Sequence, residues 1–486
     1  MAVLSRISGN FSPAPKQMPL NVRVDLPNEL WFEIFKHLSR NALCSVHGVS
    51  SLFHDIAHPL FFRDFTLDPD RHDLSSDEFL ERLSMYSSAP IAPHVHKLSI
   101  SFQFGRYFRR SGRLFTTLNS PSPLVVPLLQ SIPSFLNLRI LECDFRFNSE
   151  VHFANLGLQT LPGLQELRIH GGKLYCPRTL TSLAKIRVAH FAFTAIPGIV
   201  LLERRRETET PRSFLSMLDP ETLCSLTLSP SYDCSPAAWL AYDHDLFSTF
   251  RNLRTVTIGC DGPFLRQVHA FLTALPALQH LILTGEFRRY TEFTPSPGEA
   301  LSSQLQCYTG PREYIPIFLP QTACTRLAIN ACCIPAELRN TLEETLCTGS
   351  VTDLTLRLSL AGVCGWKVPH ALLVLFPRLE TLRIGISDAP LDDDDSDLFD
   401  AAETFDPAAL SNLPDILGAA LRASKTLKHA VIDWDLHCDT VCQLLDLRDL
   451  HEFLQRSAPK VETILFEGAI RPACGDESTD SGSFHE

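Results

Sequence analysis

The sequence predicts an α/β protein in which three short N-terminal helices precede an irregular solenoid of short parallel strands and helices. Two observations lead to this fold class. Apolar residues at helical spacing occupy roughly 40 residues near the N-terminus, and a short apolar step then recurs along the rest of the chain. Apolar residues make up 45% and charged residues 20% of the 486 residues, so both parts can bury a core.

The first predicted helix begins near Pro27, because proline lacks an N–H group that the first helical turn does not use. Four apolar residues then fall on one side of a helix of about three turns. They are Leu30, Ile34, Phe35 and Leu38. Such a stripe predicts a helix that packs on neighbouring helices.

Two more helices are expected directly after it. Ser39 and Asn41 can end the first helix and cap a second over residues 42–48. A third helix carries Leu52 and Phe53 and is expected to end before Pro59, since a residue preceding proline disfavours helical geometry. Three helices of this length form a small core, so we expect apolar surface that a partner covers.

Residues 24–65 read LPNELWFEIFKHL, then NAL, then GVSSLFHDIAHPLFFR. In order and spacing they resemble an F-box, with Phe53 where many members have Trp. The resemblance covers under a tenth of the chain. It implies that this region binds the Skp-type adaptor of an SCF ubiquitin ligase and, through it, a cullin scaffold. The residues implied as adaptor contacts are Leu26, Pro27, Leu30, Ile34, Phe35, Leu38 and Val49.

An alternative for this region follows from the residues alone. The three helices can form a self-contained start whose apolar stripe docks on the chain's own C-terminal part.

The rest of the chain repeats the step apolar-x-x-apolar-x-apolar. Clear copies are Leu138/Leu141/Cys143, Leu164/Leu167/Ile169, Leu183/Ile186/Val188, Leu223/Leu226/Leu228, Leu253/Val256/Ile258, Leu278/Leu281/Leu283, Val351/Leu354/Leu356 and Leu379/Leu382/Ile384, with an incomplete copy at Leu305/Tyr308. Segments between copies, such as 264–275, have helical apolar spacing. One short strand and one helix therefore form each repeat.

This pattern is similar to the leucine-rich repeat, which implies a stacked parallel sheet with helices on the outer arc. A doubly wound α/β sheet is the competing interpretation, but the short step recurs too often for it and Gly-rich crossover loops are absent. The Asn of the standard repeat is usually replaced here by Asp, Ser, Glu, Gly or Arg. That departure favours an irregular solenoid of the kind found in fungal F-box proteins.

The chain is divided where composition and periodicity change. The expected segments are a flexible leader at 1–21, the F-box at 22–66, a linker or helical connection at 67–93, the leucine-rich-repeat-like solenoid at 94–468 with an acidic loop at 388–412, and a disordered tail at 469–486. The acidic loop holds nine Asp and Glu residues within 388–406 and no Lys or Arg. Like charges repel, so this loop is expected at the surface.

Composition also excludes several classes of protein. A net charge of −12 argues against nucleic-acid binding, which relies on clustered Lys and Arg. Fifteen cysteines without regular spacing indicate free thiols in a reducing compartment rather than a disulfide scaffold. With no secretion signal and no apolar stretch of membrane-spanning length, we expect a cytoplasmic and/or nuclear protein that binds no membrane.

Motifs of catalysis and cofactor binding are missing from the sequence. There is no Walker loop, dinucleotide fingerprint, GxSxG elbow or kinase signature. His437, Cys438, Cys442 and His451 lack the spacing of four zinc ligands. We therefore expect a non-catalytic protein with no cofactor and no metal.

Side chains that alternate with the buried ones of each strand face the concave side of the solenoid. Expected target contacts there are Glu166, Arg168, His170, Arg357 and Arg383. Such a polar face suits a protein or peptide ligand. Taken with this face, the resemblance to an F-box implies a substrate-recognition subunit of an SCF-type ubiquitin ligase; the alternative is an adaptor-bound or free interaction scaffold without a role in ubiquitylation.

Overall fold

The structure is a computed structural model. It consists of two compact units, and the boundary between them lies between Asp64 and Phe65. The described residues are 26–68, 76–101, 125–145, 157–171, 183, 185–192, 214–229, 249–260, 265–284, 301, 304–319, 324–333, 335–345, 348–359, 369–387, 413–435 and 447–467. We call residues 26–64 the head and residues 65–467 the repeat unit. The predicted leader, acidic loop and tail lie outside the described residues.

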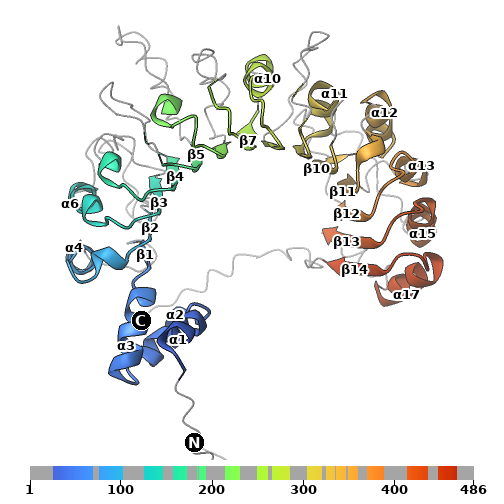
Figure 1. Cartoon of the computed structure of the whole chain (residues 1–486). Helices are drawn as coiled ribbons and strands as arrows, with labels where there is room; N and C mark the ends of the chain where they lie inside the picture. The colour runs from blue at the N-terminus through green and yellow to red at the C-terminus, as the bar shows by residue number, and fades with distance from the viewer. Residues whose placement is uncertain are drawn as a thin grey trace, which may run out of the picture. The chain divides into compact units, whose positions relative to one another are not determined.

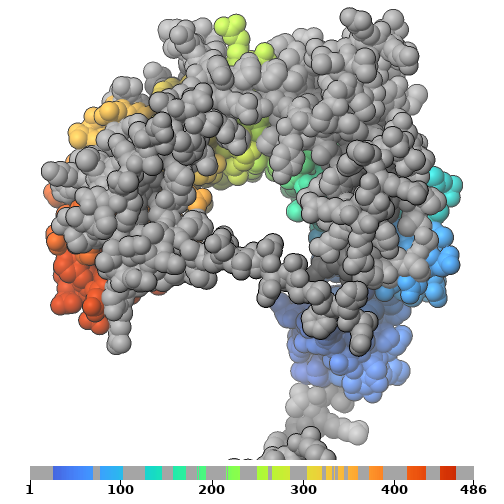
Figure 2. All heavy atoms as spheres, turned by 180° about the vertical axis from the view of Figure 1, so that it is seen from behind, coloured from blue at the N-terminus to red at the C-terminus, as the bar shows by residue number. Residues whose placement is uncertain are grey.

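The head consists of the three predicted helices, α1 (Asn28–Phe35), α2 (Arg40–His47) and α3 (Ser51–Phe61). Serines cap the second and third helices. The Ala42 backbone N–H donates to Ser39 Oγ at 3.3 Å, and the Phe53 N–H donates to Ser50 Oγ at 3.1 Å. Ser39 therefore has the capping role that the sequence predicts. Figure 2 shows the head as one compact group of atoms (blue).

The third helix does not end before Pro59, so that prediction is wrong. Pro59 lies inside α3, and the helix continues to Phe61. Proline removes one backbone donor, whose helical acceptor would be the carbonyl of Asp55. Asp55 is an exposed residue, so water can satisfy that carbonyl, and the last turn closes with a bond from the Phe62 N–H to the His58 carbonyl at 3.2 Å.

An aromatic cluster fills the centre of the head. The Phe53 ring lies 4.9 Å from the Trp31 ring and packs edge-on against the Phe35 ring at 5.2 Å. The buried residues of this cluster are Phe35, Leu43, Ile56 and Ala57. Edge-to-face packing of this kind adds about 0.5–1.5 kcal/mol beyond the burial of area. Phe53 can thus fill the place where a larger Trp is common.

The repeat unit is built on one continuous sheet. Fourteen strands of the described residues lie side by side in the order of the chain, and every pairing from β2 to β14 is parallel. The strands are β1 (Asp64–Leu67), β2 (Lys97–Ser101), β3 (Ile140–Phe145), β4 (Glu166–Gly171), β5 (Val188–Ala192), β6 (Ser225–Ser229), β7 (Thr255–Gly259), β8 (His280–Thr284), β9 (Cys307–Gly310), β10 (Arg326–Cys333), β11 (Asp353–Ser359), β12 (Thr381–Ser387), β13 (His429–Asp435) and β14 (Thr463–Glu467).

Helices connect the strands and lie on the outer side of the curved repeat unit, while the strands line its inner side (Figure 1). They are α4 (Ser76–Tyr86), α6 (Val125–Ser131), α10 (Leu265–Thr273), α11 (Ile315–Phe318), α12 (Pro335–Thr345), α13 (Pro369–Val374), α15 (Leu413–Ala423) and α17 (Leu447–Ser457), with 3-10 turns at η1 (Ala92–His94), η2 (Ile132–Ser134), η4 (Leu158–Thr160), η5 (Phe214–Met217), η7 (Arg312–Tyr314) and η8 (Thr348–Ser350). None of the described helices has the length and apolarity needed to cross a membrane.

The apolar step of the sequence is what stacks the repeats. Leu278, Leu281 and Leu283 are all completely buried, and in β8 the residues between them face the other side. Leu281 lies opposite Val256 of the preceding strand, so equivalent residues form continuous apolar rows from strand to strand. This arrangement confirms the predicted α/β solenoid and excludes a doubly wound sheet, whose strand order is not sequential.

Two positions along the sheet differ from the sequence expectation. In β5 the buried residues are Ala189 and Phe191, so Val188 does not belong to the inner row as predicted. The sheet also begins at β1 rather than after residue 94, because Phe65 and Leu67 are buried as the first strand. The first difference arises because Ala189 and Phe191 offer the same step one residue further along the chain.

The incomplete repeat at Leu305 and Tyr308 has a specific cause. Its third inner position is Gly310, and a Cβ atom there would lie 2.7 Å from the Tyr308 hydroxyl. That hydroxyl donates to the Pro311 carbonyl oxygen at 2.9 Å, and the ring is completely buried. The tyrosine thus fills the space that the third apolar residue occupies in other repeats.

We expect Gly310→Ala to destabilise the repeat unit by roughly 1–3 kcal/mol, because it overpacks a rigid and hydrogen-bonded tyrosine. Gly385→Ala is the matched control, since its Cβ would meet the flexible Arg357 side chain at 3.5 Å. Thermal unfolding of both variants measures the difference. Equal melting temperatures would show that the Tyr308 side chain can move aside without lowering the stability of the repeat unit.

Candidate protein-interaction surfaces

The head exposes apolar side chains at two places. Leu30 and Ile34 of α1 are 48% and 45% exposed, and Val49 and Leu52, around the start of α3, are 66% and 42% exposed. Leu30 and Ile34 are four residues apart and share one side of the helix. Large apolar residues that are grouped and exposed indicate a surface that a partner covers.

The seven residues implied as adaptor contacts do not have equal exposure. Leu30, Ile34, Val49 and Pro27 are exposed, and Leu26 is half-buried. Phe35 is only 3% exposed and lies in the head core, and Leu38 packs against that core. These two residues belong to the packing of the head core, which holds the helix that carries Leu30 and Ile34 in place. Leu52 was placed on the third predicted helix but was not among the predicted contacts, although it lies only three residues after Val49.

A polar row crosses the sheet from β2 to β5. Strand register places Ser99, Glu142, Arg168 and His190 opposite one another on four adjacent strands. Ser99 Oγ donates to Glu142 Oε2 at 3.1 Å, and Lys97 Nζ lies 3.4 Å from the same oxygen. We call these four residues the polar row.

The predicted contacts Glu166, Arg168 and His170 lie on β4, where they alternate with buried Leu167 and Ile169. Arg168 forms an ion pair with Glu166. The His170 ring lies 4.7 Å from the His190 ring of the next strand. The fold therefore brings the three residues onto one polar face.

Burial and neighbouring charges shift the pKa values of two groups here. Burial would raise the pKa of Glu142, but Lys97, the Ser99 hydroxyl and Arg168 together lower it. The pKa of His190 falls from its ordinary value of 6.5 to about 4, mainly because the ring is half-buried and also because His170 and Arg168 lie nearby. His190 is thus a neutral donor or acceptor at neutral pH, beside a carboxylate and a guanidinium.

This pKa predicts a loss of stability in acid. Since the unfolded chain binds a proton to His190 more tightly than the folded chain does, stability falls as pH drops from 6.5 towards about 4. The side chain is half exposed, and after discounting for solvent screening we expect roughly 1 kcal/mol. An NMR titration, assigned by comparison with His190→Gln, should give a midpoint near 4; a midpoint near 6.5 would contradict the prediction.

Arg357 and Arg383, the other predicted contacts, form a separate cluster on β11 and β12. Both are exposed, and Arg383 lies 3.8 Å from Asp433 of β13. The Arg357 stem passes beside Gly385. Strands β5 to β10 separate this cluster from β4, so the fold does not bring the five predicted target contacts into one site.

Three residues of the polar row, Ser99, Glu142 and His190, were not predicted. His190 was missed because the expected phase of β5 placed Val188 inside, which would also have turned His190 inwards. The alternation of Ala189 and Phe191 was the signal that could have corrected it. Glu142 stands between Leu141 and Cys143 of a correctly predicted repeat and follows from the same alternation.

Comparison with known proteins finds a family model that matches the head. The family model described as F-box-like matches residues 24–68. No curated protein matches the chain. Among solved structures, one that is similar is the crystal structure of a TLR13–ssRNA13 complex, at 12% sequence identity and a TM-score of 0.28; the match covers 77% of this chain and 49% of that chain. The chain thus spans about half the length of that protein.

Proposed function

We propose that this chain is a substrate-recognition subunit of an SCF-type ubiquitin ligase. The head binds a Skp-type adaptor, the adaptor joins it to a cullin scaffold, and the repeat unit holds the target protein. The chain itself is non-catalytic in this proposal. Its contribution to rate is proximity, because it holds the target near the ubiquitin-charged enzyme.

The observation that carries the proposal is the exposure of Leu30, Ile34 and Val49 within the region that the F-box-like family model matches. An isolated small domain gains nothing from exposing large apolar side chains, whereas a docking surface needs them. The polar face of the repeat unit supports the second half of the proposal. It offers Glu142, Arg168 and Arg383 as charged groups for a protein ligand.

Co-expression of the full chain with a Skp-type adaptor tests the proposal. We expect a stoichiometric complex that persists through gel filtration, and cullin in immunoprecipitates of that complex. Accumulation of co-purifying proteins when the proteasome is inhibited would identify targets. Failure to form any complex with the adaptor would refute the proposal.

The second candidate is an adaptor-bound or free scaffold that assembles proteins without ubiquitylation. It keeps the same two surfaces but predicts no cullin and no effect of proteasome inhibition on bound partners. For either function we propose a location in the cytoplasm or nucleus. From the irregular repeats we also propose a relation to fungal F-box proteins with leucine-rich-repeat-like domains.

A further inference from the structure

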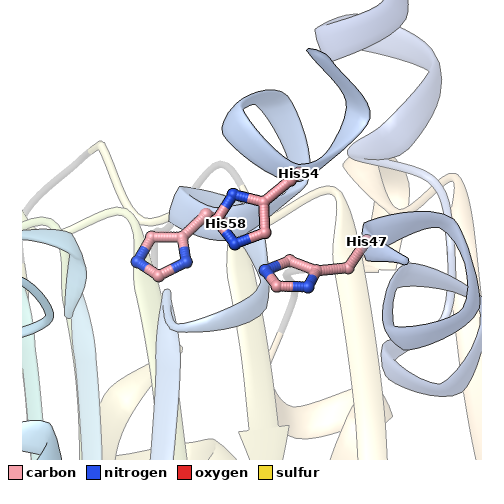
Figure 3. Close-up of side chains that lie close together, drawn as sticks. All are labelled: His47, His54 and His58. Carbon is pink, nitrogen blue, oxygen red and sulfur yellow. The ribbon is translucent and has the colours of Figure 1, made fainter. Parts of the chain in front are cut away.

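Three histidines of the head lie close together. His47 is the last residue of α2, and His54 and His58 are one turn apart on α3. The ring centroids of His47 and His54 are 4.0 Å apart, those of His54 and His58 are 5.3 Å apart, and those of His47 and His58 are 5.8 Å apart. Figure 3 shows the three rings gathered between the two helices.

Their ring nitrogens are near enough to share one ion. One nitrogen from each residue lies within 4.8 Å of those of the other two. Nitrogens bound to the same zinc ion at about 2.1 Å are roughly 3.4 Å apart, so small side-chain rotations close the site. His54 and His58 have the i, i+4 spacing that places two imidazoles on one side of a helix, as in known zinc motifs.

The groups around the three histidines indicate that the rings are metal ligands rather than merely stacked on one another. His47 Nε2 is buried and has no hydrogen-bond partner in the protein, which is costly unless something binds it. Asp55 Oδ1 lies 3.4 Å from His54 Nδ1. A carboxylate beside one ring nitrogen orients the imidazole and leaves the other nitrogen for a metal. The Phe61 and Phe62 rings lie near His47 and His58, respectively.

We propose that His47, His54 and His58 form a binding site for a divalent transition-metal ion. Imidazole ligands suit Zn²⁺, Ni²⁺ and Cu²⁺ and do not suit Mg²⁺ or Ca²⁺. Three protein ligands leave a fourth position for water or for a side chain of a partner. The ion links the end of α2 to α3 and so fixes the connection that carries Val49. No metal was expected from ligand spacing along the sequence, because two helices contribute to the site.

Calorimetric titration of the full, chelator-treated chain with Zn²⁺ near neutral pH tests this proposal. We expect saturable binding that His54→Ala weakens at least tenfold. His54 is exposed, so its removal leaves the head core intact. His37→Ala, an exposed histidine outside the cluster, is the matched control and should bind like the unmodified chain. Mg²⁺ should give no saturable heat.

Further variants exclude other ligands. Cys44 is an exposed thiol on α2, and Cys44→Ser should leave the affinity unchanged. Asp55→Asn should weaken binding roughly tenfold if it orients His54. Circular dichroism confirms that each variant is folded. Equal zinc affinity in His54→Ala and His37→Ala, or loss of binding only in Cys44→Ser, would overturn the proposal.

Discussion

Ile34→Asp is expected to abolish the stoichiometric complex between this chain and a Skp-type adaptor. Ile34 is 45% exposed on α1, so the carboxylate costs little in the free chain. In the proposed complex the same carboxylate is desolvated against apolar side chains without a partner, which costs several kcal/mol. A loss of about 100-fold or more in affinity follows from roughly 3 kcal/mol.

Pull-down from co-expressing cells measures this effect, and Leu136→Asp is the matched control. Leu136 is 59% exposed in the repeat unit, so it receives the same change outside the head. It should bind the adaptor like the unmodified chain. If Ile34→Asp is folded and captures as much adaptor as Leu136→Asp does, the exposed apolar residues of α1 are not the docking surface.

Phe35→Ala is expected to have an equally large effect for a different reason. Phe35 is 3% exposed and packs against Trp31 and Phe53 at the centre of the head. Truncating a buried phenylalanine costs about 3–5 kcal/mol. A core this small cannot absorb that loss, so we expect the head to unfold while the repeat unit remains folded.

Hydrogen exchange resolved by segment distinguishes the two variants. In Phe35→Ala, protection should be lost across α1 to α3 and kept in β6 to β8, whereas Ile34→Asp should keep protection in both. Phe35→Leu, which retains most of the volume, should restore the head. Retained protection of α1 in Phe35→Ala would mean that the aromatic cluster does not hold the head together.

Much of the fold can be read from periodicity. The burial of Leu278, Leu281 and Leu283 follows from the step apolar-x-x-apolar-x-apolar. Because each repeat stacks on the next, the same step in neighbouring repeats supports the same assignment of strand and buried side. Local ambiguity limits the method. At β5 both Val188 and Ala189 belong to an apolar step, and two features select Ala189: its alternation with Phe191 and its pairing with Leu167 on the neighbouring strand. The alternation is visible in the sequence, but the pairing is seen only in the structure.

The functional surfaces were less predictable than the fold. The exposure of Leu30 and Ile34 agrees with the implied docking role, yet the equally apolar Phe35 turns into the core because it lies on another side of the same short helix. The histidine cluster was not predictable from spacing, since His47 and His58 meet only when α2 packs on α3. Contacts between elements carry this information, and a motif within one element does not.

Hydrogen exchange of the full chain with and without a Skp-type adaptor tests most directly whether the head is a docking surface. The account predicts slower exchange in α1 and around the start of α3 on addition of the adaptor, with no change in β6 to β8. Slower exchange confined to the strands of the repeat unit, or no change anywhere at saturating adaptor, would contradict it.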